Sequence, residues 1–293
     1  MRQYESGARP RRAGTDCPGT WGLLAFPALP HLSPSMEQAM QRASINHAIL
    51  ACSLLCLSLC AWGAGEPDLY DKAVSNTARS DADRKRDPLD HPAELLRLAG
   101  IKPGMRVADL MAGNGYYSEL LSYVVGPSGH VLMLNNAAFD GWSPSWPKRV
   151  ADNRLPNVEH QTVDANHMNL APASLDAVLM IKMYHDLYWV DPKGEWPKID
   201  VPAVLDQLVR ALKPGGVVLV VDHSAKAGTG TADASRLHRI DEAYARKDFE
   251  SHGLELAGHS DLLRRPDDKR DLLSYDGPGL NHTDRFVLVF RKR

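Results

Sequence analysis

Cysteine is almost absent from this 293-residue chain, because there are four and none follows Cys60. The rest of the chain therefore has no disulfide framework, no cysteine-based zinc site and no thiol nucleophile. Positive charge is not in excess either, since 34 lysines and arginines face 36 aspartates and glutamates. A formal net charge of -2 gives no general attraction to phosphate backbones, so we expect no nucleic-acid partner.

The apolar stretch at residues 48–62, AILACSLLCLSLCAW, is too short to cross a membrane, because a spanning helix needs roughly 20 residues. Arg42 precedes it and small residues follow it, which is typical of a secretory signal peptide. We expect a signal peptide over residues 36–63 and a periplasmic or secreted protein with no stable membrane span after cleavage. An uncleaved segment or a lipid anchor at Cys60, a buried helix, and a cytoplasmic protein are the alternatives.

Residues 1–35 are rich in proline, glycine and arginine, and they show neither helical nor strand periodicity. Because a signal peptide begins at or near the initiator, we expect translation to start at Met36 or Met40. Residues 1–35 would then be an extension that the native protein lacks, and a disordered leader is the alternative. Residues 66–293 are expected to form a single domain.

From residue 66 onward, short apolar runs alternate with stretches of helical periodicity, which predicts an α/β fold with a largely parallel sheet. Strands are expected at 105–111, 129–136, 158–165, 175–183, 216–224, near 254–260 and at 285–293. Helices are expected at 91–99, at 116–125, around 201–212 and, as one long charged helix, at 235–252. Residues 71–90 are interpreted as a polar lead-in.

The turn after the first of these strands carries a chemical signal. Residues 107–115 read VADLMAGNG, so two glycines lie between a strand and a helix. Such a turn lets a ligand approach the backbone, and the helix N-terminus adds a partial positive charge. A tight turn that needs glycine only for its backbone conformation is the alternative.

Four further segments follow in a characteristic order. They are VDANHMNL at 163–170, SLDAVLMIKMYHDLYW at 174–189, LVRALKPGGVVLVVDHS at 208–224 and FVLVFRKR at 286–293. With the glycine turn, this set resembles the class I S-adenosylmethionine-dependent methyltransferases over residues 90–293. The resemblance implies a Rossmann-like, seven-stranded mixed sheet with helices on both faces and an antiparallel last strand. More narrowly, the chain resembles a small group of secreted methyltransferases of unassigned substrate.

The resemblance also implies S-adenosylmethionine as the methyl donor and a small molecule as the acceptor. The residues that would bind the donor follow the first three strands. They are Asp109, Ala112, Gly113, Asn114, Gly115, Asn135, Asp164 and Ala165.

Two positions depart from the family's pattern. Met111 stands where the first strand usually has its first glycine, and its side chain could crowd the backbone approach. Asn135 and Asn136 stand where the second strand usually ends in an acidic residue that accepts hydrogen bonds from the ribose. An asparagine carbonyl can accept such a bond, but neutral hydrogen bonds are roughly half as strong as charge-assisted ones.

Methyl transfer requires a nucleophile held in line with the sulfonium methyl group and, where the nucleophile is protonated, a base. Because such sheets build their sites at the carboxyl ends of parallel strands, the candidate catalytic residues are His185, Asp186 and His223. His185 or Asp186 could instead cap a helix, and His223 could form a hydrogen-bonded loop pair with Asp222.

Other residues admit two interpretations. Tyr116 and Tyr117 could line the donor pocket or pack, and Lys182 could reach a ligand or extend out of the sheet. Four tryptophans could form an apolar substrate wall or a packed insertion. They are Trp142, Trp146, Trp189 and Trp196.

His238, Asp241 and Glu242 have the spacing of one helix face, which we interpret as solvated rather than metal-binding; no metal is expected. Residues 264–270 alternate in charge and are interpreted as a surface loop.

Two other functions compete with methyl transfer. One is an exported, non-catalytic binding protein that keeps the fold, which the departures at Met111 and Asn135 favour. The other is a nicotinamide-dependent oxidoreductase, which the missing full G-x-G-x-x-G pattern disfavours.

Overall fold

The structure is a computed structural model that describes residues 68–293. The predicted extension at 1–35 and the predicted signal peptide at 36–63 lie outside the described residues. Within residues 68–293, no helix combines the length and the apolar character that crossing a bilayer requires.

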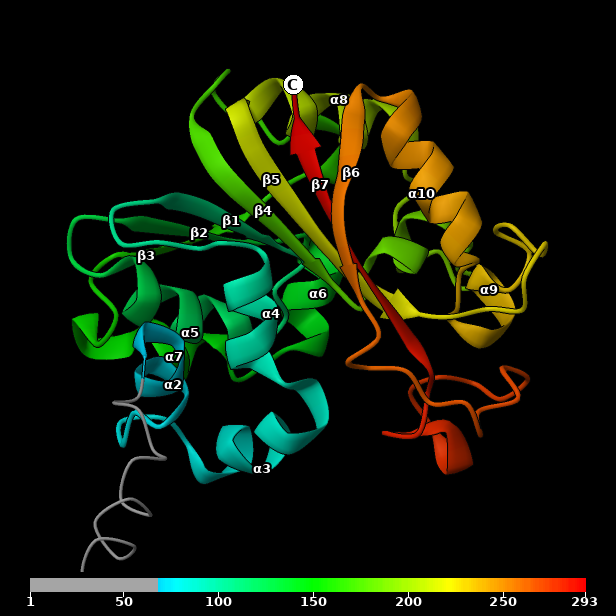
Figure 1. The fold of residues 1–293 in the computed structure, drawn as a ribbon, viewed down its shortest axis with the longest axis horizontal. Helices are drawn as coiled ribbons and strands as arrows, with labels where there is room; N and C mark the ends of the chain where they lie inside the picture. The colour runs from blue at the N-terminus through cyan, green and yellow to red at the C-terminus, as the bar shows by residue number, and fades with distance from the viewer. Residues whose placement is uncertain (1–67) are drawn as a thin grey trace, which may run out of the picture. The chain divides into compact units, whose positions relative to one another are not determined.

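A seven-stranded sheet in the order β3-β2-β1-β4-β5-β7-β6 forms the centre of the domain (Figure 1). The strands are β1 Arg106–Leu110, β2 His130–Asn135, β3 Val158–Thr162, β4 Leu175–Ile181, β5 Leu212–His223, β6 Leu254–Ser260 and β7 Arg285–Lys292. Strands β1 to β5 pair in parallel, and β7 runs antiparallel to both β5 and β6. The predicted mixed sheet with an antiparallel last strand is therefore confirmed.

Nine α-helices are described in residues 68–293. They are α2 Leu69–Val74, α3 Asp81–Asp90, α4 Pro92–Leu98, α5 Tyr116–Val125, α6 Ala137–Trp142, α7 Trp146–Val150, α8 Val201–Ala211, α9 Ala234–Leu237 and α10 Glu242–Ser251. Short 3-10 turns complete the described elements, namely η1 Ala151–Asn153, η2 Ala165–His167, η3 Tyr184–Tyr188 and η4 Gly277–Gly279.

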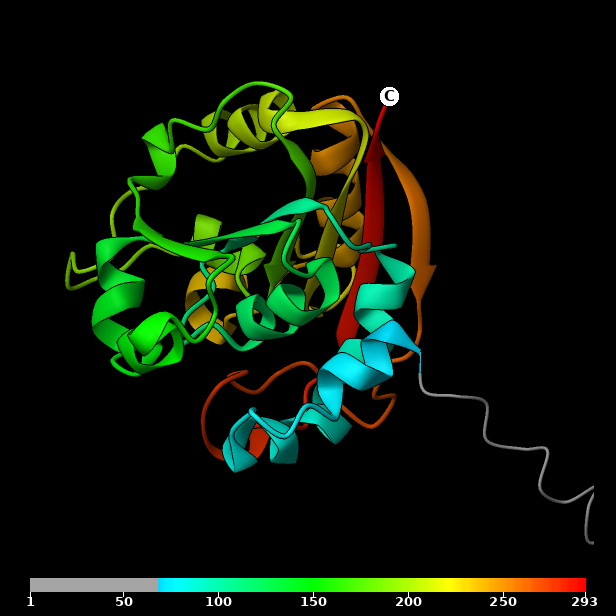
Figure 2. The ribbon, with the colours of Figure 1, turned by 90° about the vertical axis from the view of Figure 1, so that its left-hand side faces the viewer.

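Two apolar layers cover the two faces of the sheet. Because side chains alternate along a strand, Val107 and Leu179 join the layer that contains α4 and α5. Their neighbours Ala108 and Val178 join the opposite layer, which contains residues of α8 and α10. Figures 1 and 2 show these helices on opposite sides of the sheet. Helices therefore lie on both faces, as predicted.

The interpretation of residues 71–90 as a polar lead-in is wrong, because this segment contains most of α2 and all of α3. Capping explains why so polar a sequence is helical. Asp68 accepts hydrogen bonds from the backbone N–H groups at the start of α2, and Ser80 does so for α3. Arg79 donates two hydrogen bonds to Asp87 and is almost wholly buried.

The single long helix expected at 235–252 is also wrong. Helix α9 ends at Leu237, His238 adopts a left-handed conformation with φ 49°, and α10 begins after Asp241, whose side chain caps it. His238 therefore does not share a helix face with Asp241 and Glu242, and it is free to point elsewhere.

Residues 264–270 form a loop, but the purely surface interpretation is wrong. Asp268 accepts a hydrogen bond of 2.7 Å from Arg239, whose side chain is 0% exposed. Arg264 and Arg270 both contact Asp284, which is also buried. These ion pairs fix the connection between β6 and β7. That connection lies at the carboxyl end of the parallel strands, because Arg285 pairs with His223.

Candidate functional site

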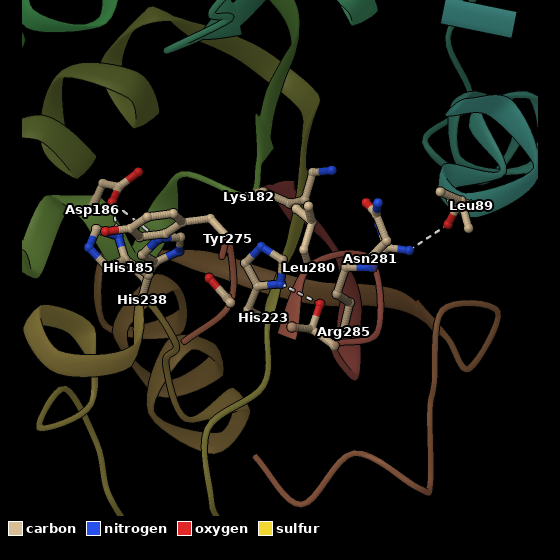
Figure 3. A pocket seen from close by; sticks show the side chains of 12 residues that line it. Leu89, Lys182, His185, Asp186, His223, His238, Tyr275, Leu280, Asn281 and Arg285 are labelled. Atoms are coloured by element: carbon tan, nitrogen blue, oxygen red, sulfur yellow. Dashed lines mark hydrogen bonds and ion pairs between the residues drawn. The ribbon is translucent and has the colours of Figure 1, made fainter. Parts of the chain in front are cut away.

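A cavity of about 260 Å³ opens where β4 and β5 end (Figure 3). Its walls come from segments far apart in the sequence. Lys182 and His185 follow β4, His223 ends β5, His238 follows α9, and Tyr275 lies in the β6–β7 connection. All three predicted catalytic residues, His185, Asp186 and His223, line this cavity.

His185 is anchored by a buried carboxylate of the neighbouring strand. Its Nδ1 lies 2.7 Å from Asp222 Oδ1, and its backbone N–H donates to Asp222 Oδ2 at 2.8 Å. Asp222 thus fixes both the backbone and the ring of His185. Asp222 therefore does more than form a loop pair with His223. It also accepts hydrogen bonds from His185, which follows the neighbouring strand β4.

Asp186 connects two histidines. Its Oδ1 lies 3.1 Å from His185 Nε2 and 3.1 Å from His238 Nδ1. The three side chains are 4% exposed for His185, 11% for Asp186 and 10% for His238. Sequence reasoning missed His238 in this role, because the expected helix assigned it to the wrong partners. The non-helical break after Leu237 brings it to the cavity.

The cluster has an uneven distribution of charge. Burial alone would lower the pKa of His185, but the carboxylates of Asp186 and Asp222 outweigh it and raise that pKa to about 10. Burial raises the pKa of Asp186, yet His185 and His238 bring it down to about 2. Burial and the nearby cations lower the pKa of His223 well below its usual range. The cluster therefore holds His185 as a cation, which has no lone pair to act as a base.

The opposite wall of the cavity carries two cations. Lys182 Nζ lies 3.3 Å from Asp90, and Arg285 donates to the same carboxylate. Burial and the charge of Arg86 lower the pKa of Lys182 to about 8, although Asp90 opposes that shift. Lys182 therefore does not extend out of the sheet, because it pairs with Asp90 and faces the cavity.

A second cavity of about 560 Å³ adjoins the first and shares Asp186, His238 and Tyr275 with it. Aromatic rings line it, since Phe139, Trp142 and Trp189 contribute to its wall. Trp142 stacks on Trp196, with ring centroids 5.8 Å apart. Trp146 is separate from this group, because it stacks on His160. Three of the four tryptophans thus form one aromatic cluster, part of it open to the cavity.

Met111, which precedes the glycine turn after β1, does not block that turn. Met111 has a φ of 49°, a left-handed conformation that glycine adopts more easily. Its side chain is 3% exposed and belongs to the apolar layer with Ala108 and Val178. The expected crowding of the backbone by Met111 is therefore wrong, because the side chain packs into the core.

Asn135 closes the turn instead of facing an open pocket. Its Oδ1 accepts from Gly113 N–H at 2.9 Å, and its Nδ2 donates to Gly113 O at 3.0 Å and to Asp140 at 2.8 Å. A carboxylate could not donate these bonds, which explains an asparagine at this position. Asp140, a residue that sequence reasoning missed, also accepts from His160 and Thr162.

Asn136 offers a free group at the end of β2. Its Oδ1 caps α6 by accepting from Phe139 N–H, whereas its buried Nδ2 has no hydrogen-bond partner among the described residues. A buried donor without a partner is costly, so this group suits a ligand acceptor. Asp164 and Ala165 follow β3, with Asp164 largely exposed and capping η2.

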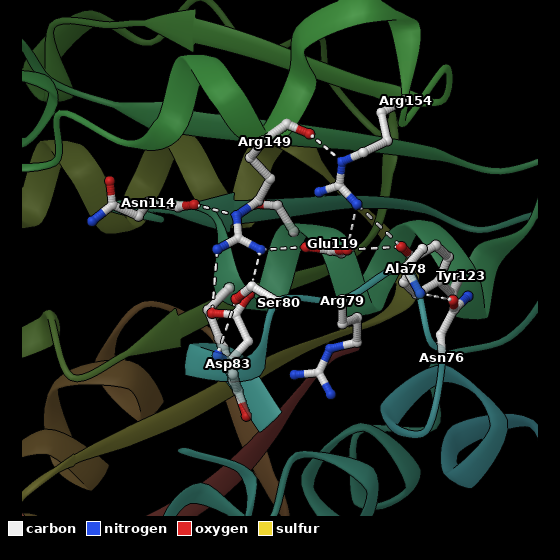
Figure 4. Close-up of polar contacts among 12 residues, drawn as sticks. Asn76, Ala78, Arg79, Ser80, Asp83, Asn114, Glu119, Tyr123, Arg149 and Arg154 are labelled. Carbon is white, nitrogen blue, oxygen red and sulfur yellow. Dashed lines mark hydrogen bonds and ion pairs between the residues drawn. The ribbon is translucent and has the colours of Figure 1, made fainter. Parts of the chain in front are cut away.

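Asp109 and Gly115 face the protein interior. Asp109 accepts a hydrogen bond of 2.7 Å from Ser118, and burial raises its pKa to about 6. Gly115 has a φ of 75°, and a Cβ there would lie 2.9 Å from atoms of Arg149 and Met133. Arg149 also contacts Glu119, Asp83 and the carbonyl of Asn114 (Figure 4).

Tyr116 and Tyr117 are packed rather than exposed to a pocket, at 4% exposure each. Tyr116 donates to Asp87 of α3, and the two rings meet edge to face. Of the residues after β1, Ala112 and Gly113 are half-buried and Asn114 is exposed, whereas the tyrosines support the turn from behind.

Comparison with known proteins agrees with this arrangement. A family described as "Methyltransferase domain" matches residues 108–220. The chain is 28% identical over 130 residues to the ubiquinone/menaquinone biosynthesis C-methyltransferase UbiE of Ectopseudomonas mendocina, covering 44% of this chain and 46% of that protein. It is 28% identical over 131 residues to an arsenite methyltransferase of Halobacterium salinarum, covering 42% and 28%. The chain therefore spans less than half the length of these relatives.

Solved structures share the fold at low identity. A SAM-dependent methyltransferase from Aquifex aeolicus superposes with a TM-score of 0.52 and 19% identity, covering 78% of this chain and all of that one. The [4+2]-cyclase SpnF superposes with a TM-score of 0.50 and 14% identity, covering 74% and 85%. The fold is thus Rossmann-like, of the type found in methyltransferases.

Residues 108–220 match a methyltransferase domain, and the sheet order and the glycine turn agree with that match. Together these findings support a class I S-adenosylmethionine-dependent methyltransferase. S-adenosylmethionine is the methyl donor of that family.

Proposed function

We propose that the protein transfers the methyl group of S-adenosylmethionine to a small molecule bound where β4 and β5 end. The observation that carries this proposal is the pair of adjoining cavities, which share Asp186, His238 and Tyr275. When bound, the donor supplies an electrophilic methyl group on sulfur. The chain's own residues then have to hold the acceptor and remove its proton.

The donor's nucleoside is proposed to lie along the ends of β1, β2 and β3. Support comes from the unpartnered Nδ2 of Asn136 and from Asp164 and Ala165 after β3. Asn135 is not proposed to contact the ribose directly, because both ends of its amide are engaged by Gly113 and Asp140. Its role is to hold the turn in shape.

The acceptor is proposed to be an aromatic molecule that carries a negatively charged or strongly polar group. Phe139, Trp142 and Trp189 supply an apolar wall for its ring. Lys182 and Arg285 supply cations on the far side of the adjoining cavity. His223 lines the same cavity as Lys182 and Arg285 and is the proposed proton acceptor. Its Nδ1 lies 2.7 Å from the hydroxyl oxygen of Thr283.

The test is calorimetric titration of the purified protein with S-adenosylmethionine and with S-adenosylhomocysteine. Asn136→Ser keeps an oxygen to cap α6 but removes the unpartnered amide donor without adding a charge, so donor affinity should fall about 5- to 10-fold. Asn153→Ser makes the same chemical change at an exposed position and should leave affinity unchanged. No heat with either ligand would contradict the proposal.

Turnover is tested separately, by screening aromatic carboxylates and phenols for release of S-adenosylhomocysteine. His223→Gln should lower turnover by about 100-fold while leaving donor affinity intact. Donor binding without turnover, across acceptors that demonstrably bind, would favour the second candidate.

The second candidate is a non-catalytic binding protein with the same fold. The closed turn favours it, because Asn135 occupies the Gly113 N–H that a ligand could otherwise reach. The superposition on a protein named as a [4+2]-cyclase supports only the narrower point that this fold is not tied to methyl transfer.

We further propose that the protein is exported through residues 36–63. A fusion of residues 36–70 to a phosphatase that is active only after export should give activity. The same fusion with Leu54→Arg and Leu55→Arg should give none, because the apolar run is interrupted. Equal activity of the two fusions would contradict export by this segment.

A further inference from the structure

We propose that His185, Asp186 and His238 bind a divalent transition-metal ion at the floor of the cavity. This inference does not require that the protein transfer methyl groups. Among residues 68–293, these three form the one group of three or more potential ligands whose donor atoms lie within 4.8 Å of one another. Figure 3 shows their side chains converging beside Tyr275.

The distances between the donor atoms suit three ligands that bind the same ion. Asp186 Oδ1 lies 3.1 Å from His185 Nε2 and 3.1 Å from His238 Nδ1. Ligands at about 2.1 Å from an ion stand about 3.0 Å apart in an octahedral site and about 3.4 Å apart in a tetrahedral one. Both distances fall within that interval, and the two histidine nitrogens lie within 4.8 Å of each other, so a shift of one ring brings all three atoms to one ion.

The partners of His185 leave one ring nitrogen for a metal ion. Its Nδ1 lies 2.7 Å from Asp222 Oδ1, so Nδ1 carries a hydrogen that it donates to that carboxylate. Its Nε2 faces Asp186 Oδ1 at 3.1 Å, a distance that either a shared proton or a metal ion can bridge. A metal ion that binds here displaces the Nε2 proton to solvent and binds both atoms.

Asp222 completes the arrangement from behind. A histidine that binds a metal commonly donates its other N–H to a carboxylate, which orients the ring and makes it a better ligand. Asp222 is 0% exposed and holds both the ring and the backbone of His185. Asp186 and Asp222 also bring two negative charges, which balance a divalent ion.

The ligand set favours some metals over others. Two imidazoles and one carboxylate suit Zn²⁺, Fe²⁺, Co²⁺ or Ni²⁺, whereas Mg²⁺ and Ca²⁺ prefer oxygen alone. Three protein ligands leave coordination positions open, and the cavity adjoins them. An oxygen atom of a bound small molecule could occupy such a position.

The experiment uses protein without a histidine tag, freed of metal with a chelator and titrated with Co²⁺, whose visible absorption reports its ligands. We expect one equivalent to bind, to be displaced by Zn²⁺ and to resist excess Mg²⁺. Asp186→Asn and His238→Gln should each weaken binding about 100-fold. Asp222→Asn should weaken it about 10-fold, because it only orients His185.

The control is His252→Gln, which should bind Co²⁺ like the unmodified protein. His252 also lies near two carboxylates, with its Nδ1 2.7 Å from Asp206 and its Nε2 4.0 Å from Asp248, but it lines neither cavity. Circular dichroism checks that each variant is folded.

Three results would overturn the proposal. They are the absence of stoichiometric Co²⁺ uptake by unmodified protein, displacement by Mg²⁺, and unchanged affinity in folded Asp186→Asn. The first of these does not depend on whether any variant folds.

Discussion

The carboxyl edge of the sheet has two halves that differ in how they are filled. Beside β1 and β2, side chains hold the turn in shape, because Asn135 binds both sides of Gly113 and Arg149 packs against Gly115. Beside β4 and β5, two cavities open between charged and aromatic side chains. The first half is a closely packed turn, beside which the donor is proposed to lie, and the second half contains the open cavities.

The two halves also differ in origin. The family match ends at residue 220, and the turn lies within it. His223, His238, Tyr275 and Arg285 lie beyond it, yet all four line the cavity at β4 and β5. The shared part of the chain therefore supplies the scaffold and one wall. The remaining wall, which would select a substrate, comes from segments outside the match.

The largest loss of stability is expected from a change at Asp90, which contacts two cations of the open half. Asp90 is buried and contacts Arg86, Lys182 and Arg285. Asp90→Asn removes the charge that three cations share, so the free energy of unfolding should fall by about 3–5 kcal/mol. Urea unfolding measures it. A loss below about 1 kcal/mol would mean that these cations do not depend on Asp90.

The next effect tests how tightly the turn is packed. Gly115→Ala should cost about 2–4 kcal/mol, because it combines a left-handed backbone with a Cβ 2.9 Å from Arg149 and Met133. Gly100→Ala is the control, since its φ is 67° but a Cβ would meet nothing within 4 Å. It should cost only about 1–2 kcal/mol. Equal losses of unfolding free energy in the two variants would show that a Cβ at Gly115 does not clash with Arg149 and Met133.

A third prediction concerns pH. Burial raises the pKa of Asp109 to about 6 in the folded chain, from 3.8 for an ordinary aspartate. The folded state then holds a proton more tightly, so this contribution to stability is present at pH 4 and lost as pH rises through 6.

Asp109→Asn lacks this titration, so its stability relative to the unmodified protein should improve by on the order of 2 kcal/mol between pH 4 and pH 7. Urea unfolding across this range measures the difference. Parallel pH profiles for the two proteins would contradict a raised pKa.

The smallest effect is expected where the open half meets solvent. Tyr275 is 57% exposed, so Tyr275→Ala should change the free energy of unfolding by less than about 0.5 kcal/mol. Trp196→Ala, in the same aromatic region but 4% exposed, should cost about 3 kcal/mol. A large loss from Tyr275→Ala would mean that the cavity wall is part of the core.

Periodicity predicted the sheet well, because buried strands such as β4 and β5 carry uninterrupted apolar runs. It failed for the polar helix α3, whose formation depends on a cap at Ser80. It also failed at His238, where a helical spacing hid a left-handed break. The spacing of apolar residues shows which side chains are buried. It does not reveal a helix cap such as Ser80 or a break in a helix such as the one at His238.

The sequence by itself determined the order of the strands along the chain, the glycine turn and the presence of His185, Asp186 and His223 at strand ends. These follow from local rules, since apolar spacing and chain direction are written along the chain. Only the tertiary structure decided that His238 meets Asp186 and that Asp222 orients His185. Contacts between residues 37 or 52 positions apart depend on how the whole sheet and its connections pack, which no local pattern contains.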